Sequence, residues 1–152
     1  GQGLSVSPIE IARAVGAIAN GGVMTVPHFV TSAKGEQKNW DAKKHRVVSK
    51  YAASQVTSMM ETVVEEGTGT AAQIAGYEVA GKTGTAEQAS SSGGYKESSF
   101  MSSFIGFAPA SAPQALCYIT LDHTPRHGSS AAVPFRTIMA KTLDVLGAKP
   151  ST

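Results

Sequence analysis

Residues 76–85 carry two overlapping patterns, and each would give the same lysine a different chemistry. The run Gly76-Tyr-Glu-Val-Ala-Gly81-Lys82-Thr83 matches the phosphate-binding loop G-x-x-x-x-G-K-[ST]. That loop works where a buried strand enters it and a helix leaves it, because backbone N–H groups and the helix N-terminus then face the phosphate. Here the tail of a predicted helix and a Gly/Thr turn come before Gly76, and a Ser/Gly-rich run unsuited to a helix follows Thr83. The surroundings therefore argue against a nucleotide site.

The second pattern, Lys82-Thr83-Gly84-Thr85, suits recognition of a carboxylate at the edge of a sheet. Lysine supplies a fixed positive charge, and the hydroxyls of Thr83 and Thr85 can donate hydrogen bonds to the same anion. Gly84 has no side chain, so a ligand backbone can lie against the strand there. An unpaired backbone N–H on that edge can also face a developing oxyanion. Three letters recur by chance, so this interpretation depends on the elements around the motif.

Two helices are predicted in the first half of the chain. Ser7 caps the first, because proline follows it and glutamate comes three residues later, and an Asn-Gly-Gly run ends this helix after residue 19. A second helix runs from a Ser49 cap to Glu66. Its predicted apolar stripe consists of Val56, Met59, Met60, Val63 and Val64. Between the helices, the β-prone runs Val26–Thr31 and Arg46–Val48 flank a polar stretch and predict a surface hairpin.

The second half predicts strands, then one more helix. The predicted strands are Tyr77–Thr85, Ser102–Ala108 and Ala115–Leu121, with a loop at Ala86–Ser99 and a helix at Ser130–Leu146. Short connections favour antiparallel neighbours, so an α+β fold with helices flanking an antiparallel sheet is expected. The two faces predicted for the last strand are Leu116, Tyr118 and Thr120 on one side, and Cys117, Ile119 and Leu121 on the other.

Composition narrows the class of protein. The 152 residues are 41% hydrophobic and 16% charged, which is typical of a globular chain with a core to bury. The net charge of +2 comes with scattered lysines, so no concentrated basic face for nucleic acid is predicted. No apolar run approaches the roughly 20 residues that a membrane-spanning helix needs.

No cofactor or metal site is predicted. His123 and His127 lie four residues apart, but Pro125 between them prevents a helix and only Asp122 is a nearby acidic ligand, so both are interpreted as solvated loop histidines. The remaining histidines, His28 and His45, have no recognisable partners. The single cysteine, Cys117, lies in a core-like strand and is interpreted as an inert buried thiol.

Several blocks share their residues and spacing with one protein family: Gly1-Gln2-Gly3, Ser7-Pro8, Ile18-Ala19-Asn20-Gly21-Gly22, Val63-Val64, Gly67-Thr68-Gly69-Thr70, Ala80-Gly81-Lys82-Thr83-Gly84-Thr85-Ala86, Ser103-Phe104-Ile105-Gly106-Phe107-Ala108-Pro109-Ala110 and Ala131-Ala132-Val133-Pro134-Phe135. In these blocks the chain resembles class B penicillin-binding proteins, the monofunctional transpeptidases of septal and elongation peptidoglycan synthesis. The resemblance implies a fold similar to that of penicillin-binding proteins and serine β-lactamases. The sequence differs from the family pattern before the final helix. It reads Arg126-His127-Gly128-Ser129-Ser130 there, where many family members carry a double glycine.

The resemblance assigns roles to the second pattern. Lysine-threonine-glycine is the last motif of the set S-x-x-K, S-x-N, K-T-G in penicillin-recognising enzymes. It implies that Lys82, Thr83 and Thr85 bind the carboxylate of peptidoglycan stem peptides and of β-lactams, with Gly84 completing the motif. The implied parent is a D,D-transpeptidase that works through an acyl-serine intermediate. The parent is expected to be membrane-anchored, at the extracytoplasmic face of the bacterial cytoplasmic membrane, within a division or elongation complex.

The first two motifs of that set are absent from this sequence. Thr31-Ser-Ala-Lys34 has the first spacing with threonine, but it follows the first helix, out of the family's order, and is interpreted as chance. We therefore expect residues 1–152 to be the C-terminal part of a transpeptidase domain whose nucleophile lies upstream, and the isolated chain to be inactive. Its expected partners are the missing N-terminal part of the domain or a second copy of itself. Two alternatives stay open: the C-terminal part of a serine β-lactamase or β-lactam sensor, or a non-catalytic binding fragment.

Overall fold

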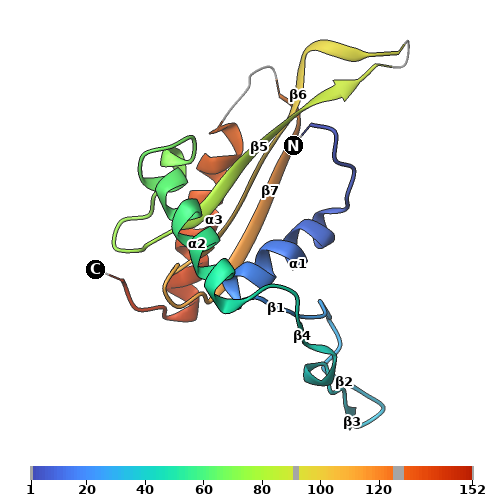
Figure 1. Cartoon of the computed structure of the whole chain (residues 1–152), viewed down its shortest axis with the longest axis vertical. Helices are drawn as coiled ribbons and strands as arrows, with labels where there is room; N and C mark the ends of the chain where they lie inside the picture. Colours follow the sequence, from blue (N-terminus) through green and yellow to red (C-terminus); the bar gives the residue numbers. More distant parts are fainter. Residues whose placement is uncertain (1, 91–92, 125–128, 152) are drawn as a thin grey trace.

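The computed structural model describes residues 2–90, 93–124 and 129–151, and a three-stranded antiparallel sheet is its framework (Figure 1). The strands lie in the order β5-β6-β7, so each one pairs with its neighbour along the chain. Their bounds are β5 (Ala80–Ala89), β6 (Tyr95–Ala108) and β7 (Ala115–Thr124). The helices that flank this sheet are α1 (Pro8–Ala19), α2 (Lys50–Glu65) and α3 (Ala132–Leu146). The predicted α+β fold with an antiparallel sheet is confirmed.

The two faces of β7 face two apolar clusters. Cys117, Ile119 and Leu121 pack against the cluster that holds the buried residues of α3. Leu116, on the opposite face, packs with side chains of α1 in the second cluster. Helix α2 contacts β5 and contributes one residue to each cluster, Val64 to the first and Met60 to the second. The alternation predicted for this strand is therefore correct, and α3 covers one face of the sheet as expected.

Phe104 on β6 lies at the centre of the larger cluster and is fully buried. Its ring meets the Phe135 ring of α3 at 4.6 Å between centroids. Glycines surround the ring: a Cβ at Gly81 would lie 2.4 Å from it, one at Gly106 3.1 Å and one at Gly69 3.3 Å. These positions accept no side chain without displacing the ring or the backbone, because interiors are packed at crystal-like density.

The predicted strand ends differ from those observed. The first strand begins at Ala80 rather than Tyr77, because Tyr77 forms an isolated bridge with Ile74 and donates its hydroxyl to the Ala148 carbonyl at 2.8 Å. It then continues to Ala89, through residues predicted as loop.

The second strand likewise begins at Tyr95 instead of Ser102. Backbone pairing extends the hairpin, with Glu87 opposite Phe100 and, after a bulge, Ala89 opposite Tyr95. Ser- and Gly-rich runs have low strand propensity, but cross-strand hydrogen bonding overrides propensity where a partner strand is already aligned. The third strand also runs past Leu121, to Thr124.

The first two helices begin where their caps predicted. The Glu10 carboxylate accepts hydrogen bonds from the Ser7 backbone N–H at 2.8 Å and hydroxyl at 2.7 Å, and the Ser49 hydroxyl accepts from the Ala52 N–H at 3.0 Å. The predicted stripe of α2 is partly wrong: Met59 is 65% exposed and Val56 37% exposed. The residues that α2 buries are Ala53, Met60 and Val64. Met60 follows Ala53 by seven positions and Val64 follows Met60 by four, so these side chains lie on one narrow face of the helix, which meets the sheet.

The final helix begins later than predicted, at Ala132, after a 3-10 turn at Ser129–Ala131. Gly147 ends it in the left-handed conformation, with φ of 63°, as expected for a helix stop. Residues 126–128, part of the run in which the sequence departs from the family that it resembles, lie outside the described residues. None of the helices described is long and apolar enough to cross a membrane.

Residues 23–48 project from the body of the molecule (Figure 1). Two short ladders form there, β1 (Val23–Met24) with β4 (His45–Arg46) and β2 (Ser32–Ala33) with β3 (Glu36–Gln37). The predicted hairpin runs are therefore wrong in position. The Thr31 to Lys34 segment, which the sequence analysis interprets as a chance match to S-x-x-K, includes β2 and enters the β2–β3 turn. His28 has a partner that the sequence did not indicate, because it stacks on Trp40 with 4.9 Å between ring centroids.

The packing of Phe104 predicts the effect of a single methyl group. Gly81→Ala should lower the free energy of unfolding by about 1–3 kcal/mol, because the new Cβ overlaps the buried ring. Gly16→Ala is the matched control: its Cβ would lie 3.9 Å from the nearest atom, in a helix interior, so stability should rise by about 0.5–1 kcal/mol. Equilibrium unfolding in urea measures both, and equal stability of the two variants would contradict this packing.

Glu61 on α2 predicts a pH-dependent change in stability. Burial, followed by the negative charges of Glu78 and Glu65, raises the pKa of the Glu61 carboxyl above its ordinary value. The folded state then holds this proton more tightly than the unfolded state, so ionisation of Glu61 costs stability as pH rises through its pKa. Glu61→Gln should therefore raise the free energy of unfolding at pH 7, and by much less at pH 3, in urea titrations. Glu36→Gln, on the exposed β3, controls for loss of a charge; an equal gain from it would contradict the assignment.

Candidate active site

Lys82, Thr83, Gly84 and Thr85 lie together on β5, at the edge of the three-stranded sheet. Each pairs with β6 on one side, and their partners are Ile105, Phe104, Ser103 and Ser102 in that order. No strand in the described parts of the chain pairs with the other side of β5. The prediction that this motif occupies an edge strand is therefore confirmed.

Hydrogen bonds show which backbone groups face the open side of β5. The Glu87 N–H donates to the side-chain oxygen of Gln2 at 2.7 Å, so it points away from β6. N–H directions alternate along a strand, and the pairing has no register shift between Ala80 and Glu87. The N–H groups of Thr83 and Thr85 therefore point to the same open side. In agreement, the outward Thr83 carbonyl accepts from the Lys82 ammonium at 3.0 Å.

The Thr83 hydroxyl lies at the centre of a small polar cluster. Lys82 Nζ donates to Thr83 Oγ1 at 3.2 Å, and Thr68 Oγ1 lies 2.8 Å from the same oxygen. A hydroxyl has one proton and two lone pairs. When Thr68 donates and Lys82 donates, both acceptor positions of Thr83 are filled, and its own proton remains for an anion at the edge.

Thr68 is a site residue that was not recognised from the sequence. It was named there only as part of the family-like run Gly67-Thr68-Gly69-Thr70, without a role in the site. It lies in the turn after α2, where the Gly69 N–H donates to the Val63 carbonyl at 2.9 Å. A Cβ at Gly67 would lie 2.9 Å from that carbonyl oxygen, and a Cβ at Gly69 3.0 Å. Only glycines allow the turn to fold back so tightly. The Gly-Thr-Gly spacing after a helix was the available signal.

The cluster is suited to binding an anion. It combines one exposed ammonium group, threonine hydroxyls spaced two residues apart on one face of the strand, and outward backbone N–H groups. The nucleotide interpretation is excluded, because strand rather than helix follows Thr83.

Burial raises the pKa of the Cys117 thiol above its ordinary value, which fits an unreactive cysteine outside this site.

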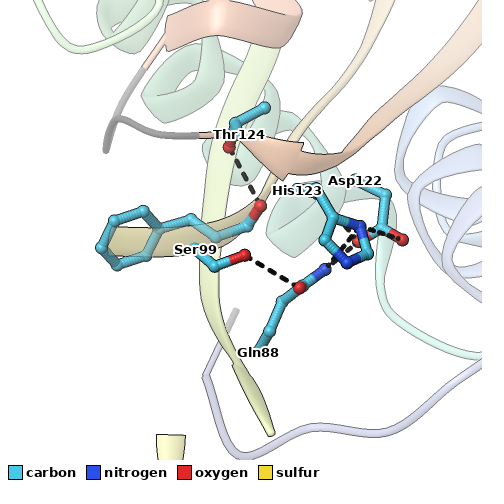
Figure 2. A network of polar contacts seen from close by, with 6 residues as sticks. Gln88, Ser99, Asp122, His123 and Thr124 are labelled. Atoms are coloured by element: carbon cyan, nitrogen blue, oxygen red, sulfur yellow. Dashed lines mark hydrogen bonds and ion pairs between the residues drawn. The ribbon is translucent and has the colours of Figure 1, made fainter. Parts of the chain in front are cut away.

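A second polar network lies at the far end of the sheet (Figure 2). The Gln88 side-chain nitrogen donates to the Asp122 carboxylate and lies 3.4 Å from His123 Nδ1, while the Ser99 hydroxyl donates to the side-chain oxygen of Gln88 at 3.0 Å. His123 Nδ1 lies 3.1 Å from Asp122. Gln88, Asp122 and His123 lie at the two bulges, so these contacts connect all three strands there, away from the candidate site.

His123 is in β7, so its prediction as a loop residue is wrong, although its side chain is 65% exposed. His127 lies outside the described residues. Within residues 2–90, 93–124 and 129–151, no group of three or more His, Cys, Asp or Glu side chains could hold a metal ion.

Residues 1–140 match the sequence pattern of the penicillin binding protein transpeptidase domain. The chain belongs to this family. Stage V sporulation protein D of Bacillus subtilis is 39% identical to it over 160 residues, which cover 99% of this chain and 25% of that protein. Peptidoglycan D,D-transpeptidase FtsI of Buchnera aphidicola is 34% identical over 156 residues, covering 99% of this chain and 27% of that protein. The chain thus spans about a quarter of the length of these relatives.

Solved structures share the same fold. Penicillin binding protein 3 of Mycobacterium tuberculosis superposes with a TM-score of 0.86 at 30% identity, covering 100% of this chain and 38% of the crystallised one. The same protein complexed with aztreonam gives the same TM-score, identity and coverage.

Proposed function

We propose that this chain is the C-terminal part of a D,D-transpeptidase domain, which cross-links peptidoglycan stem peptides and is acylated by β-lactams. The observation that carries this proposal is the open edge of β5, where Lys82 and Thr68 are hydrogen-bonded to Thr83 and the Thr85 N–H faces outward. Its family membership supports the reaction class. A relative named as a D,D-transpeptidase and a structural neighbour complexed with aztreonam support the substrate class.

In this proposal the edge holds the ligand and an upstream segment of the parent supplies the serine. The terminal carboxylate of the stem peptide lies between the Lys82 ammonium and the hydroxyls of Thr83 and Thr85. The serine oxygen bonds to the carbonyl carbon of the penultimate D-Ala, the bond to the terminal D-Ala breaks, and that residue leaves with a proton on its amine. An amine of a neighbouring stem peptide then takes the acyl group and restores the serine. The Thr85 N–H stabilises the oxyanion of each step.

The proposed setting follows from the substrate. Peptidoglycan is cross-linked outside the cytoplasmic membrane, so the parent would act at its extracytoplasmic face. A division or elongation complex is the proposed partner, together with the nucleophile-bearing part of the same domain. Two relatives are named a stage V sporulation protein and a peptidoglycan D,D-transpeptidase, and the second name supports cell-wall synthesis as the setting.

Covalent labelling of the full-length parent by fluorescent penicillin tests the proposal. Wild type should be labelled, and the isolated 152-residue chain should not. Gly84→Val should abolish or severely slow labelling, because its side chain keeps the ligand backbone from the strand. Thr85→Val should cost about 1–3 kcal/mol of acylation free energy, since it removes one hydroxyl but keeps the N–H.

Thr120→Val, at an exposed position of β7, is the matched control and should label like wild type. Wild-type acylation rates in Gly84→Val would mean that the ligand does not lie along β5. Rapid turnover of penicillin in place of a lasting label would indicate a β-lactamase, and a parent that takes no label would indicate a binding protein.

The hydrogen bond between Thr68 and Thr83 predicts how substitutions of Thr68 change the acylation rate of the full-length parent. Thr68→Val removes one partner of the Thr83 hydroxyl, so its proton is no longer directed outward and acylation should slow about 5- to 20-fold, equivalent to about 1–2 kcal/mol. Thr68→Ser keeps the hydroxyl and should react within about twofold of wild type. Stopped-flow acylation by a chromogenic cephalosporin measures both rates. Equal rates for the valine and serine variants would exclude a hydroxyl-mediated role.

A further inference from the structure

The segment before α1 runs beside the C-terminal half of β5. Leu4 and Val6 line a small cavity of about 90 Å³ together with side chains of α1 and of all three strands of the sheet, including Thr85, Met101 and Tyr118. Gln2, two residues before Leu4, reaches the open edge of β5, where its side-chain oxygen accepts the Glu87 N–H at 2.7 Å. This segment therefore occupies part of the edge that carries the candidate site.

The hydrogen bond from Glu87 limits how a peptide can pair with β5. Thr83 and Thr85 share with Glu87 an outward direction of their N–H and carbonyl groups, because these directions alternate along the strand. A peptide that adds antiparallel to this edge pairs one residue with Thr85, and pairs the residue two positions nearer its N-terminus with Glu87. The Glu87 N–H is already satisfied by Gln2. The ladder must therefore stop at Thr85 unless Gln2 is displaced.

We propose that Gln2 is a positioning residue that sets the length of peptide read by the edge strand. Its amide oxygen stands where a ligand carbonyl would otherwise bind, two residues before the acylated D-Ala. Ligand and Gln2 offer Glu87 the same kind of acceptor, so their hydrogen bonds are of similar strength. Gln2 is joined covalently to α1 through the segment that lines this cavity, and an acceptor held near its partner by the chain has the advantage of a high effective concentration. This inference rests on the proposed function, since it assigns a ligand to the β5 edge.

Two synthetic substrates differ in whether they carry the carbonyl group that could accept the Glu87 N–H. Acetyl-D-Ala-D-Ala ends one position too early to reach Glu87, whereas the acetyl oxygen of acetyl-Gly-D-Ala-D-Ala lies where it can accept the Glu87 N–H. The full-length parent is assayed for release of D-Ala, and the ratio of kcat/KM for the longer to the shorter substrate is the readout. In wild type this ratio should be close to one.

In Gln2→Ala the ratio should rise about fivefold, through KM alone, because one net hydrogen bond becomes available to the longer substrate. Reaction of the shorter substrate should not change. Gln2→Glu keeps an oxygen at the same reach and should restore the wild-type ratio, while Gln2→Asn, one methylene shorter, should behave like alanine. Gln55→Ala, on the exposed surface of α2, controls for loss of a glutamine.

An unchanged ratio in both Gln2→Ala and Gln2→Asn would overturn the proposal, as would a raised ratio already present in wild type. Amide hydrogen exchange of the ligand-free parent gives an independent test: the Glu87 N–H should exchange faster in the alanine variant and at the wild-type rate in the glutamate variant. Equal exchange in wild type and alanine variant would mean that the cap is not formed. Exchange still reports on Gln2 if no variant takes penicillin, a result that would contradict the proposed function alone.

Discussion

The burial of one ring, that of Phe104, is the constraint on which the remaining structure depends. It lies opposite Thr83 on the neighbouring strand and contacts Phe135 of α3, so it links the candidate site to the core. The lack of a side chain at Gly81 and Gly69 lets β5 and the turn after α2 approach the ring from two directions. The meeting of two threonine hydroxyls at the strand edge thus follows from packing, since the polar contact forms where the glycines allow the backbones to come close.

The fold was predicted from patterns among neighbouring residues. The features that could not be predicted depend on contacts between residues that are distant in the sequence. The Ser7 and Ser49 caps, the alternation along β7 and the Lys82 motif could be recognised because each signal lies within a few neighbouring residues. Thr68 could not be placed from the sequence, since its role depends on a partner 15 residues away that local pattern does not reveal. The predicted strands of the β5–β6 hairpin were too short for the same reason. Cross-strand pairing, rather than the propensity of single residues, forms the Ser- and Gly-rich end of this hairpin.

Some of the polar groups at the anion-binding edge have internal partners before any ligand arrives. Lys82 donates to the carbonyl and hydroxyl oxygens of Thr83, and Gln2 accepts the N–H of Glu87. These contacts hold the Lys82 ammonium and the Thr83 hydroxyl in place, while the N–H groups of Thr83 and Thr85 face the open side of β5, where the ligand is proposed to bind. Such an arrangement costs little reorganisation, because the dipoles already point to where charge will lie. The network of Gln88, Ser99 and Asp122 adds to this rigidity by connecting the three strands at their bulges.

The order β5-β6-β7 follows the order of the chain, and this has a bearing on how the edge is formed during folding. Each strand closes onto the one beside it through a short connection, so the loop-closure entropy is small at every step. Sheets built from such sequential pairings have low contact order and fold faster than sheets whose neighbours are distant in sequence. We expect β5 and β6, which carry Lys82, Thr83 and Thr85, to pair on the time scale of hairpin formation, whereas Thr68 and Gln2 join this edge from farther along the chain and close longer loops.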